Sequence, residues 1–295
     1  MNIFKKLPVL LEMIKFEHTL FALPFALASA VVAAHGIPAW GMLVWILLAM
    51  VGARSAAMGF NRIVDKKYDL ENPRTKNRAI PAGLISLGEA WVLVIISSAL
   101  FLFSAAMLNR LALILSPVAL AIIFGYSYAK RFTSLSHLVL GLCLGIAPVG
   151  AWIAVRGTLL TSSGNFDWPP VILAAAVTLW TAGFDILYSL QDIDFDRRAG
   201  LFSIPQKVGA SAALLISRLA HYIAFVLLLD FGRFAGLGAA YYTGVAIIAL
   251  SLVYEHALVH PRDFSKINAA FFTMNGVVSV VFFVFTLIDR ILCRL

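Results

Sequence analysis

The chain has 295 residues, of which 61% are hydrophobic and only 13% are charged. A soluble domain is typically about 25% charged, so a soluble chain could not bury this much apolar surface, and the bilayer must be the solvent. Long uninterrupted apolar runs exclude a β-barrel, whose strands alternate apolar and polar residues, and predict an all-α integral membrane protein. The net charge of +8 is unevenly distributed and indicates membrane topology rather than nucleic-acid binding.

The first 17 residues mix charged and apolar side chains, which predicts an interfacial amphipathic helix lying against membrane lipid. Beyond them, nine apolar stretches approach the roughly 20 residues that a membrane-spanning helix needs. We expect these helices at residues 18–35, 39–63, 88–108, 111–129, 137–155, 169–191, 210–231, 235–254 and 268–288.

Lysine and arginine concentrate on one side of the predicted bundle, in the N-terminal segment and the loops 64–87, 130–136, 192–209 and 255–267. By the positive-inside rule this side is cytoplasmic, which places the N-terminus inside the cell and the active face at the inner side of the cell membrane. The other side has only Arg110, Arg156, Arg233, Arg290 and Arg294.

A first polar motif closes the predicted helix 39–63. Asn61, Asp65 and Asp69 recur every four residues and therefore share one helical face, with Arg54 two turns earlier on that face. A charged residue inside an apolar helix is a candidate functional residue. Arg54 is compatible both with pairing to a motif aspartate and with binding the carboxylate of a small acidic substrate.

A second motif, Asp185, Asp192 and Asp196, closes the predicted helix 169–191 with spacings of seven and four. Asp65 and Asp192 each end the second helix of a four-helix set, which hints at two four-helix pseudo-repeats plus a ninth helix in a single transmembrane domain of residues 1–295.

Carboxylates placed four residues apart repel, and a charge at depth in a bilayer costs about 2.5–3.5 kcal/mol even on a mild scale, so a positive partner must compensate. Mg²⁺ typically binds one or two carboxylates together with substrate phosphates, so the two motifs predict Mg²⁺ ions holding a diphosphate. The alternative is that the aspartates pair with nearby lysines and arginines at a solvated helix end, which explains one such motif more readily than two.

The loop after the first motif presents Arg74, Lys76 and Arg78, spaced by two and punctuated by proline and glycine. Such cations suit phosphate binding, although an ordinary positive-inside loop looks similar.

Tyr126 and Lys130 lie one helical turn apart at the end of the predicted helix 111–129, and Arg131 follows. An interfacial tyrosine beside a lysine that reaches toward water is common in membrane helices. This third group therefore gains functional meaning only beside the two aspartate motifs.

Taken together, these motifs resemble the UbiA-type intramembrane aromatic prenyltransferases over the whole chain. The resemblance implies that Asp65, Asp69, Asp192 and Asp196 bind Mg²⁺ and the diphosphate of a polyprenyl donor. It also places the basic pair of Lys130 and Arg131 near the diphosphate and the acceptor. One departure is that the first motif begins Asn61-Arg62, where the family usually has Asn-Asp.

The resemblance implies transfer of a polyprenyl chain from polyprenyl diphosphate to a small aromatic acid, with 4-hydroxybenzoate of ubiquinone biosynthesis favoured and a dihydroxynaphthoate of menaquinone biosynthesis as the alternative. The allylic C–O bond would break, and aromatic side chains would shield the resulting cation. Asp185 would either accept the ring proton or support the metal site. Candidates for the aromatic shield are Phe60, Tyr68, Tyr126, Tyr128 and Tyr188.

Other classes remain as alternatives. A secondary transporter shares internal repeats and intramembrane carboxylates, but its sites lie near the midplane rather than at one face. The CDP-alcohol phosphotransferases also carry aspartates at helix ends, yet their Asp-Gly pattern is absent. Within the resembled family, attachment of a prenyl tail to haem or chlorophyll is a further possibility.

Overall fold

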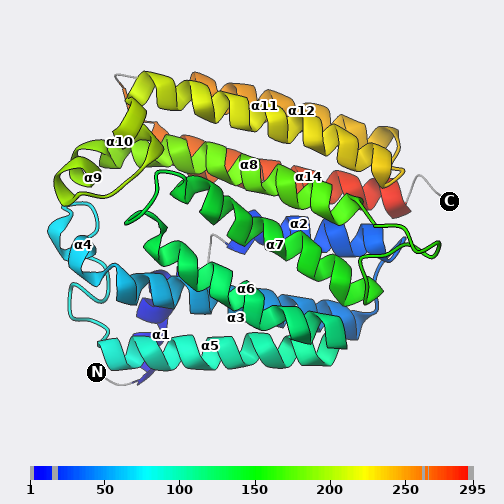
Figure 1. The fold of residues 1–295 in the computed structure, drawn as a ribbon, viewed down its shortest axis with the longest axis horizontal. Coiled ribbons are helices and arrows are strands. Elements are labelled where there is room, and N and C mark those ends of the chain that lie inside the picture. The colour runs from blue at the N-terminus through cyan, green and yellow to red at the C-terminus, as the bar shows by residue number, and fades with distance from the viewer. Residues whose placement is uncertain (1–2, 15–18, 261–262, 265, 292–295) are drawn as a thin grey trace. The chain divides into compact units, whose positions relative to one another are not determined.

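The computed structural model describes residues 3–14, 19–260, 263–264 and 266–291, and these residues fold almost entirely into helices (Figure 1). Within these ranges a helix occupies each of the nine predicted stretches. They are α2 (Thr19–Ala33), α3 (Trp40–Val64), α5 (Leu87–Leu108), α6 (Arg110–Ala129), α7 (Ser136–Arg156), α8 (Pro169–Ser189), α11 (Ala210–Phe234), α12 (Ala239–Ala257) and the run of α13 (Ile267–Ala269), η3 (Ala270–Met274, a π-helical turn) and α14 (Asn275–Ile291).

Seven helices in the described part of the chain are long and apolar enough to cross a membrane, including the one formed by Pro169–Ala199. The predicted number of nine is not reached by this criterion. The apolar part of α2, Phe21–Ala33, is too short, and α12 is absent from the set although it is 19 residues long. The chain is therefore a multi-pass, all-helical membrane protein with seven candidate spans.

The predicted N-terminal amphipathic helix is present as α1 (Ile3–Met13). Residues 1–2 and 15–17 of that prediction lie outside the described residues, as do residues 261–262 and 265 of the predicted cytoplasmic loop and the topology marker Arg294. The location of α1 at a membrane interface remains a prediction.

The helices gather into two compact units. The first contains α1, α3 from Val44 onward, α4 (Lys66–Glu71), α5 and α6 to Tyr128; the second contains α2, the start of α3 and all described residues from Ala129. This division does not follow the predicted four-plus-four repeat, because α2 belongs with the second unit.

In the first unit, α1 is anchored by an apolar cluster that includes Met13, Ile80 and Ile85. Helix α3 approaches α5 closely at Gly52, where a Cβ atom would lie 2.8 Å from the main-chain nitrogen of Phe101. The absence of a side chain there allows the two backbones to meet, as is common in membrane helices.

In the second unit, α8 is packed between α7 and α11 (Figure 1). Glycine again permits the contact, because a Cβ on Gly141 of α7 would collide with the Thr178 carbonyl of α8. Aromatic rings fill the centre: Phe25 of α2 lies 5.0 Å from Trp180 and 4.6 Å from Phe282, measured between ring centroids. These contacts explain why α2 belongs to this unit.

Candidate active site

In each aspartate motif the helix is interrupted at one aspartate, which is Asp65 in the first motif and Asp192 in the second. Helix α3 ends at Val64, and Asp65 has φ −87° and ψ 3° before α4 begins at Lys66. Helix α8 gives way to a 3₁₀ turn, η2 (Leu190–Asp192), where Asp192 has φ −104° and ψ 4° before α9 (Ile193–Ala199). This sparsely populated backbone region is frequent at active sites. A one-residue irregularity therefore separates the aspartates of each motif, which the predicted regular helical spacing did not include.

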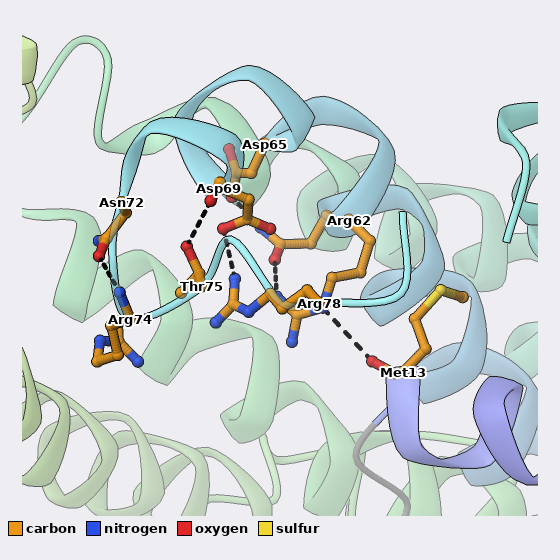
Figure 2. Close-up of polar contacts among 9 residues, drawn as sticks. Met13, Arg62, Asp65, Asp69, Asn72, Arg74, Thr75 and Arg78 are labelled. Carbon is orange, nitrogen blue, oxygen red and sulfur yellow. Dashed lines mark hydrogen bonds and ion pairs between the residues drawn. The ribbon is translucent and has the colours of Figure 1, made fainter. Parts of the chain in front are cut away.

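In the first motif, hydrogen bonds orient the carboxylates. Asn61 Nδ2 donates to Asp65 Oδ2 at 2.8 Å. Asp69 is buried, and its Oδ1 accepts from Arg78 Nη1 at 2.6 Å (Figure 2). The other oxygen of Asp69, Oδ2, is buried and has no hydrogen-bond partner within the described residues.

The basic loop folds back onto the same helix end. Thr75 Oγ1 donates to the main-chain oxygen of Asp69 at 3.1 Å, and the Arg74 main-chain nitrogen donates to Asn72 Oδ1 at 2.9 Å (Figure 2). These bonds bring Arg78 to Asp69, while the side chains of Arg74 and Lys76 stay exposed. The loop thus brings the Arg78 cation to Asp69 and leaves the side chains of Arg74 and Lys76 exposed to solvent.

Arg62 stands where the resembled motif usually has a carboxylate. It is buried, its Nε donates to the Met13 carbonyl at 3.4 Å, and its Nη1 donates to Asn61 Oδ1 at 3.4 Å (Figure 2). It therefore connects α1 to the first motif, a role that the sequence pattern did not indicate.

In the second motif, Asp192 and Asp196 are both buried. Lys130 Nζ lies 3.5 Å from Asp196 Oδ2, so the predicted basic residue does contact a motif aspartate. Asp185 lies on α8, where its Oδ2 is 2.7 Å from Nδ1 of the fully buried His137. His137 was missed in the sequence, because nothing in its spacing relates it to a residue 48 positions away.

For the other predicted site residues, the structure gives burial and ring contacts. Arg54 is half-buried on α3, and Tyr126 and Arg131 are half-buried near the end of α6. Among the aromatic candidates, Phe60 lies 6.1 Å from Tyr128 between ring centroids, in the first unit. Tyr188 lies in the second unit with its ring 4.3 Å from that of Phe271. Tyr68 is half-buried on α4.

No group of three histidine, cysteine or acidic side chains within the described part of the chain forms a ready-made metal cage. Each motif instead offers a pair of carboxylates. This suits Mg²⁺, which needs only one or two carboxylates when substrate phosphates complete its coordination. The buried, unsatisfied Oδ2 of Asp69 is an acceptor that such an ion would satisfy.

Residues 22–277 match the model of the UbiA prenyltransferase family. The chain belongs to this family. The family prediction, the helical membrane fold and the reaction class of prenyl transfer are thereby confirmed.

Curated relatives extend the likeness. The 4-hydroxybenzoate octaprenyltransferase of Vibrio parahaemolyticus is 32% identical over 253 residues, covering 86% of this chain and 86% of that protein. The protein of the same name from Vibrio atlanticus is 31% identical over 259 residues, covering 88% of each.

Solved structures agree. The apo structure of a UbiA homolog from Aeropyrum pernix K1 matches with a TM-score of 0.83 and 38% identity, covering 92% of this chain and 98% of that one. A UbiA homolog from Archaeoglobus fulgidus bound to GPP and Mg²⁺ matches with a TM-score of 0.69 at 19% identity, covering 94% and 98%, and shows the shared fold alone.

Proposed function

We propose that this prenyltransferase moves a polyprenyl chain from polyprenyl diphosphate to a small aromatic acid and releases diphosphate. The favoured acceptor is 4-hydroxybenzoate, because the relatives at about 31% identity carry that name. A dihydroxynaphthoate is the second acceptor to test. Transfer takes place within the membrane, so the prenyl tail stays in lipid.

The observation that carries the proposal is the matched local structure of the two motifs. Asp65 and Asp192 interrupt their helices with similar backbone angles. Four residues later, each motif has a buried aspartate with a basic partner, Asp69 with Arg78 and Asp196 with Lys130. Two carboxylate pairs, each with its own cation, suit a ligand that has two linked phosphate groups.

When bound, Mg²⁺ held by Asp65, Asp69, Asp192 and Asp196 would neutralise charge on the departing diphosphate. The basic side chains of Arg78 and Lys130 donate hydrogen bonds to its oxygens, assisted by Arg74, Lys76 and Arg131. These contacts strengthen as the allylic C1–O bond breaks and its electron pair goes to the diphosphate.

The acceptor ring carbon beside the hydroxyl then bonds to the allylic carbon, and a base removes the ring proton. Asp185 is the proposed base, because it is two turns from Asp192 and its side chain is 18% exposed. Arg54 would hold the acceptor carboxylate and Asn61 would orient Asp65, while Tyr126 with Phe60 and Tyr128 would shield the cation.

The topology is part of the proposal. We place the N-terminus and both motifs at the cytoplasmic face and infer nine crossings in two pseudo-repeats plus one, because most lysines and arginines fall in the loops of one side. Under this arrangement α2 and α12 also cross, although α2 has only 15 residues. Cysteine labelling of single-cysteine variants from each side of sealed vesicles would test it.

Purified protein in detergent would be given labelled polyprenyl diphosphate with 4-hydroxybenzoate or a dihydroxynaphthoate, with Mg²⁺ or with chelator. Asp65→Asn and Asp69→Asn should abolish transfer. Asp194→Asn is the matched control, because Asp194 is an exposed aspartate in the second motif. Transfer that survives chelation or both substitutions would overturn the proposal, as would donor binding without transfer to either acceptor.

A further inference from the structure

A buried imidazole joins Asp185 to the chain segment that follows the second motif. His137 is the second residue of α7, and its side chain has no solvent exposure. On one side its Nδ1 lies 2.7 Å from Asp185 Oδ2 of α8, and on the other its Nε2 lies 3.3 Å from the main-chain nitrogen of Ile204, the first residue of α10 (Ile204–Val208).

The Ile204 contact determines which ring nitrogen carries the proton. A main-chain N–H can only donate, so Nε2 of His137 must accept and is unprotonated. The neutral imidazole then has its proton on Nδ1, which it donates to the carboxylate of Asp185. Because both ring nitrogens are engaged, the ring cannot turn without losing both hydrogen bonds.

The segment that donates to His137 also braces the second motif. The Leu201 main-chain nitrogen donates to the Asp196 carbonyl at 2.9 Å, and that of Phe202 donates to the Lys130 carbonyl at 2.7 Å. His137 thus links the carboxylate of Asp185 to the backbone that carries the proposed diphosphate-binding residues. A displacement of this backbone would therefore move the Asp185 carboxylate through the side chain of His137.

We propose that His137 is a positioning residue, which holds the Asp185 carboxylate in the orientation that accepts the proton of the prenylated acceptor ring. The inference rests on the proposed function, in which Asp185 is the base. As the ring proton moves to a carboxylate oxygen of Asp185, the C–H electron pair restores the aromatic ring. His137 keeps its Nδ1 proton throughout and neither gains nor loses charge.

Two substitutions of His137 by amide residues each keep one of its two hydrogen bonds and remove the other. In His137→Asn the amide nitrogen takes the place of Nδ1, so donation to Asp185 is kept and acceptance from Ile204 is lost. In His137→Gln the amide reaches the place of Nε2, so acceptance from Ile204 is kept and the donor to Asp185 is lost. Both variants remain polar; glutamine is close in volume to histidine, and asparagine is smaller.

We expect His137→Asn to keep kcat within about 5-fold and His137→Gln to lower kcat by about 10- to 100-fold, with the KM for the donor unchanged in both. A matched control is His221→Asn, which removes another buried histidine that contacts the Trp180 carbonyl but lies outside the proposed site. It should lower thermal stability and leave kcat of the folded protein unchanged.

Equal kcat values for the two His137 variants, or an effect on KM alone, would overturn the inference. So would an unchanged kcat in Asp185→Asn, while prenyl transfer itself would then still stand. If neither His137 variant folds, Asp185→Glu shifts the carboxylate relative to His137 without removing either group, and kcat should fall with KM preserved. Absence of transfer in the unsubstituted protein would instead refute the proposed function.

Discussion

The guanidinium of Arg62 donates to the main-chain carbonyl of Met13, 49 positions earlier in the chain. The residue that departs from the family's usual Asn-Asp pattern therefore fastens α1 to the end of α3. Its positive charge also stands beside Asn61, in the motif that contains Asp65 and Asp69. A positive charge at this position attracts the carboxylates of Asp65 and Asp69, but arginine, unlike the usual aspartate, offers no oxygen to a metal ion.

Restoring the usual carboxylate should therefore harm this protein. Arg62→Asp removes both hydrogen bonds and adds a buried negative charge beside Asp65 and Asp69, so we expect the free energy of unfolding to fall by about 3 kcal/mol or more. Thermal denaturation in detergent and protease release of the N-terminal segment would measure the effect. Arg110→Asp, at an exposed position of the same unit, should change little. Equal stability of the two variants would contradict the anchoring role.

The pairing of Arg78 with Asp69 leads to a second prediction. Arg78→Gln removes a charged hydrogen-bond donor from the proposed diphosphate site, so kcat/KM should fall by about 10- to 100-fold, with Arg78→Lys intermediate. Asn77→Ala, an exposed neighbour, is the control. If Arg78→Gln instead kept its kcat/KM and needed less Mg²⁺, Arg78 would only be occupying a metal ligand.

Packing of α7 on α8 depends on one glycine. Gly141→Ala would drive a methyl group into the carbonyl of Thr178, a rigid main-chain atom, and should cost about 1–3 kcal/mol of stability. Gly150→Ala lies on the same helix with nothing within 4 Å of its Cβ, and should be neutral or slightly stabilising. Comparing their denaturation midpoints checks the prediction, and equal midpoints would show that the two helices can separate without cost.

The start of α12 is capped by a side chain of α14. Asp289 is buried, and its carboxylate accepts from the Gly238 main-chain nitrogen at 2.8 Å and from that of Tyr241 at 3.4 Å. Asp289→Ala should cost about 1–3 kcal/mol, since the N–H groups of Gly238 and Tyr241 lose their acceptor, and Asp289→Asn should recover part of it. Thr243→Ala, exposed on α12, is the control for this denaturation series.

The sequence predicted what the bilayer itself enforces. Apolar runs must be helices because every main-chain group needs an internal partner, so the long helices such as α5 and α11 begin and end close to their expected bounds. The four-residue spacing likewise identified Asp65 and Asp69, which the structure places at one helix end with Arg78. Their roles in catalysis remain predictions.

Tertiary pairing was beyond the sequence. The contacts of His137 with Asp185 and of Arg62 with Met13 join residues 48 and 49 positions apart, and no local pattern marks such partners. The helix interruptions at Asp65 and Asp192 were also missed, because a change at a single residue leaves the surrounding sequence pattern intact. Helix α2 was grouped with its neighbours in sequence, whereas Phe25 packs on Trp180 and Phe282.

The cap that Asp289 places on α12 has a consequence for synthesis of the protein. Ribosomes make α12 before α14, so the acceptor of the Gly238 N–H group, Asp289, is synthesised 51 residues after Gly238. Until then the connection between α11 and α12 depends on water or lipid headgroups for its hydrogen bonds. The α11–α12 hairpin therefore reaches its final hydrogen bonding only after α14 has been made. A nascent chain stopped before Asp289 should be held by chaperones or degraded.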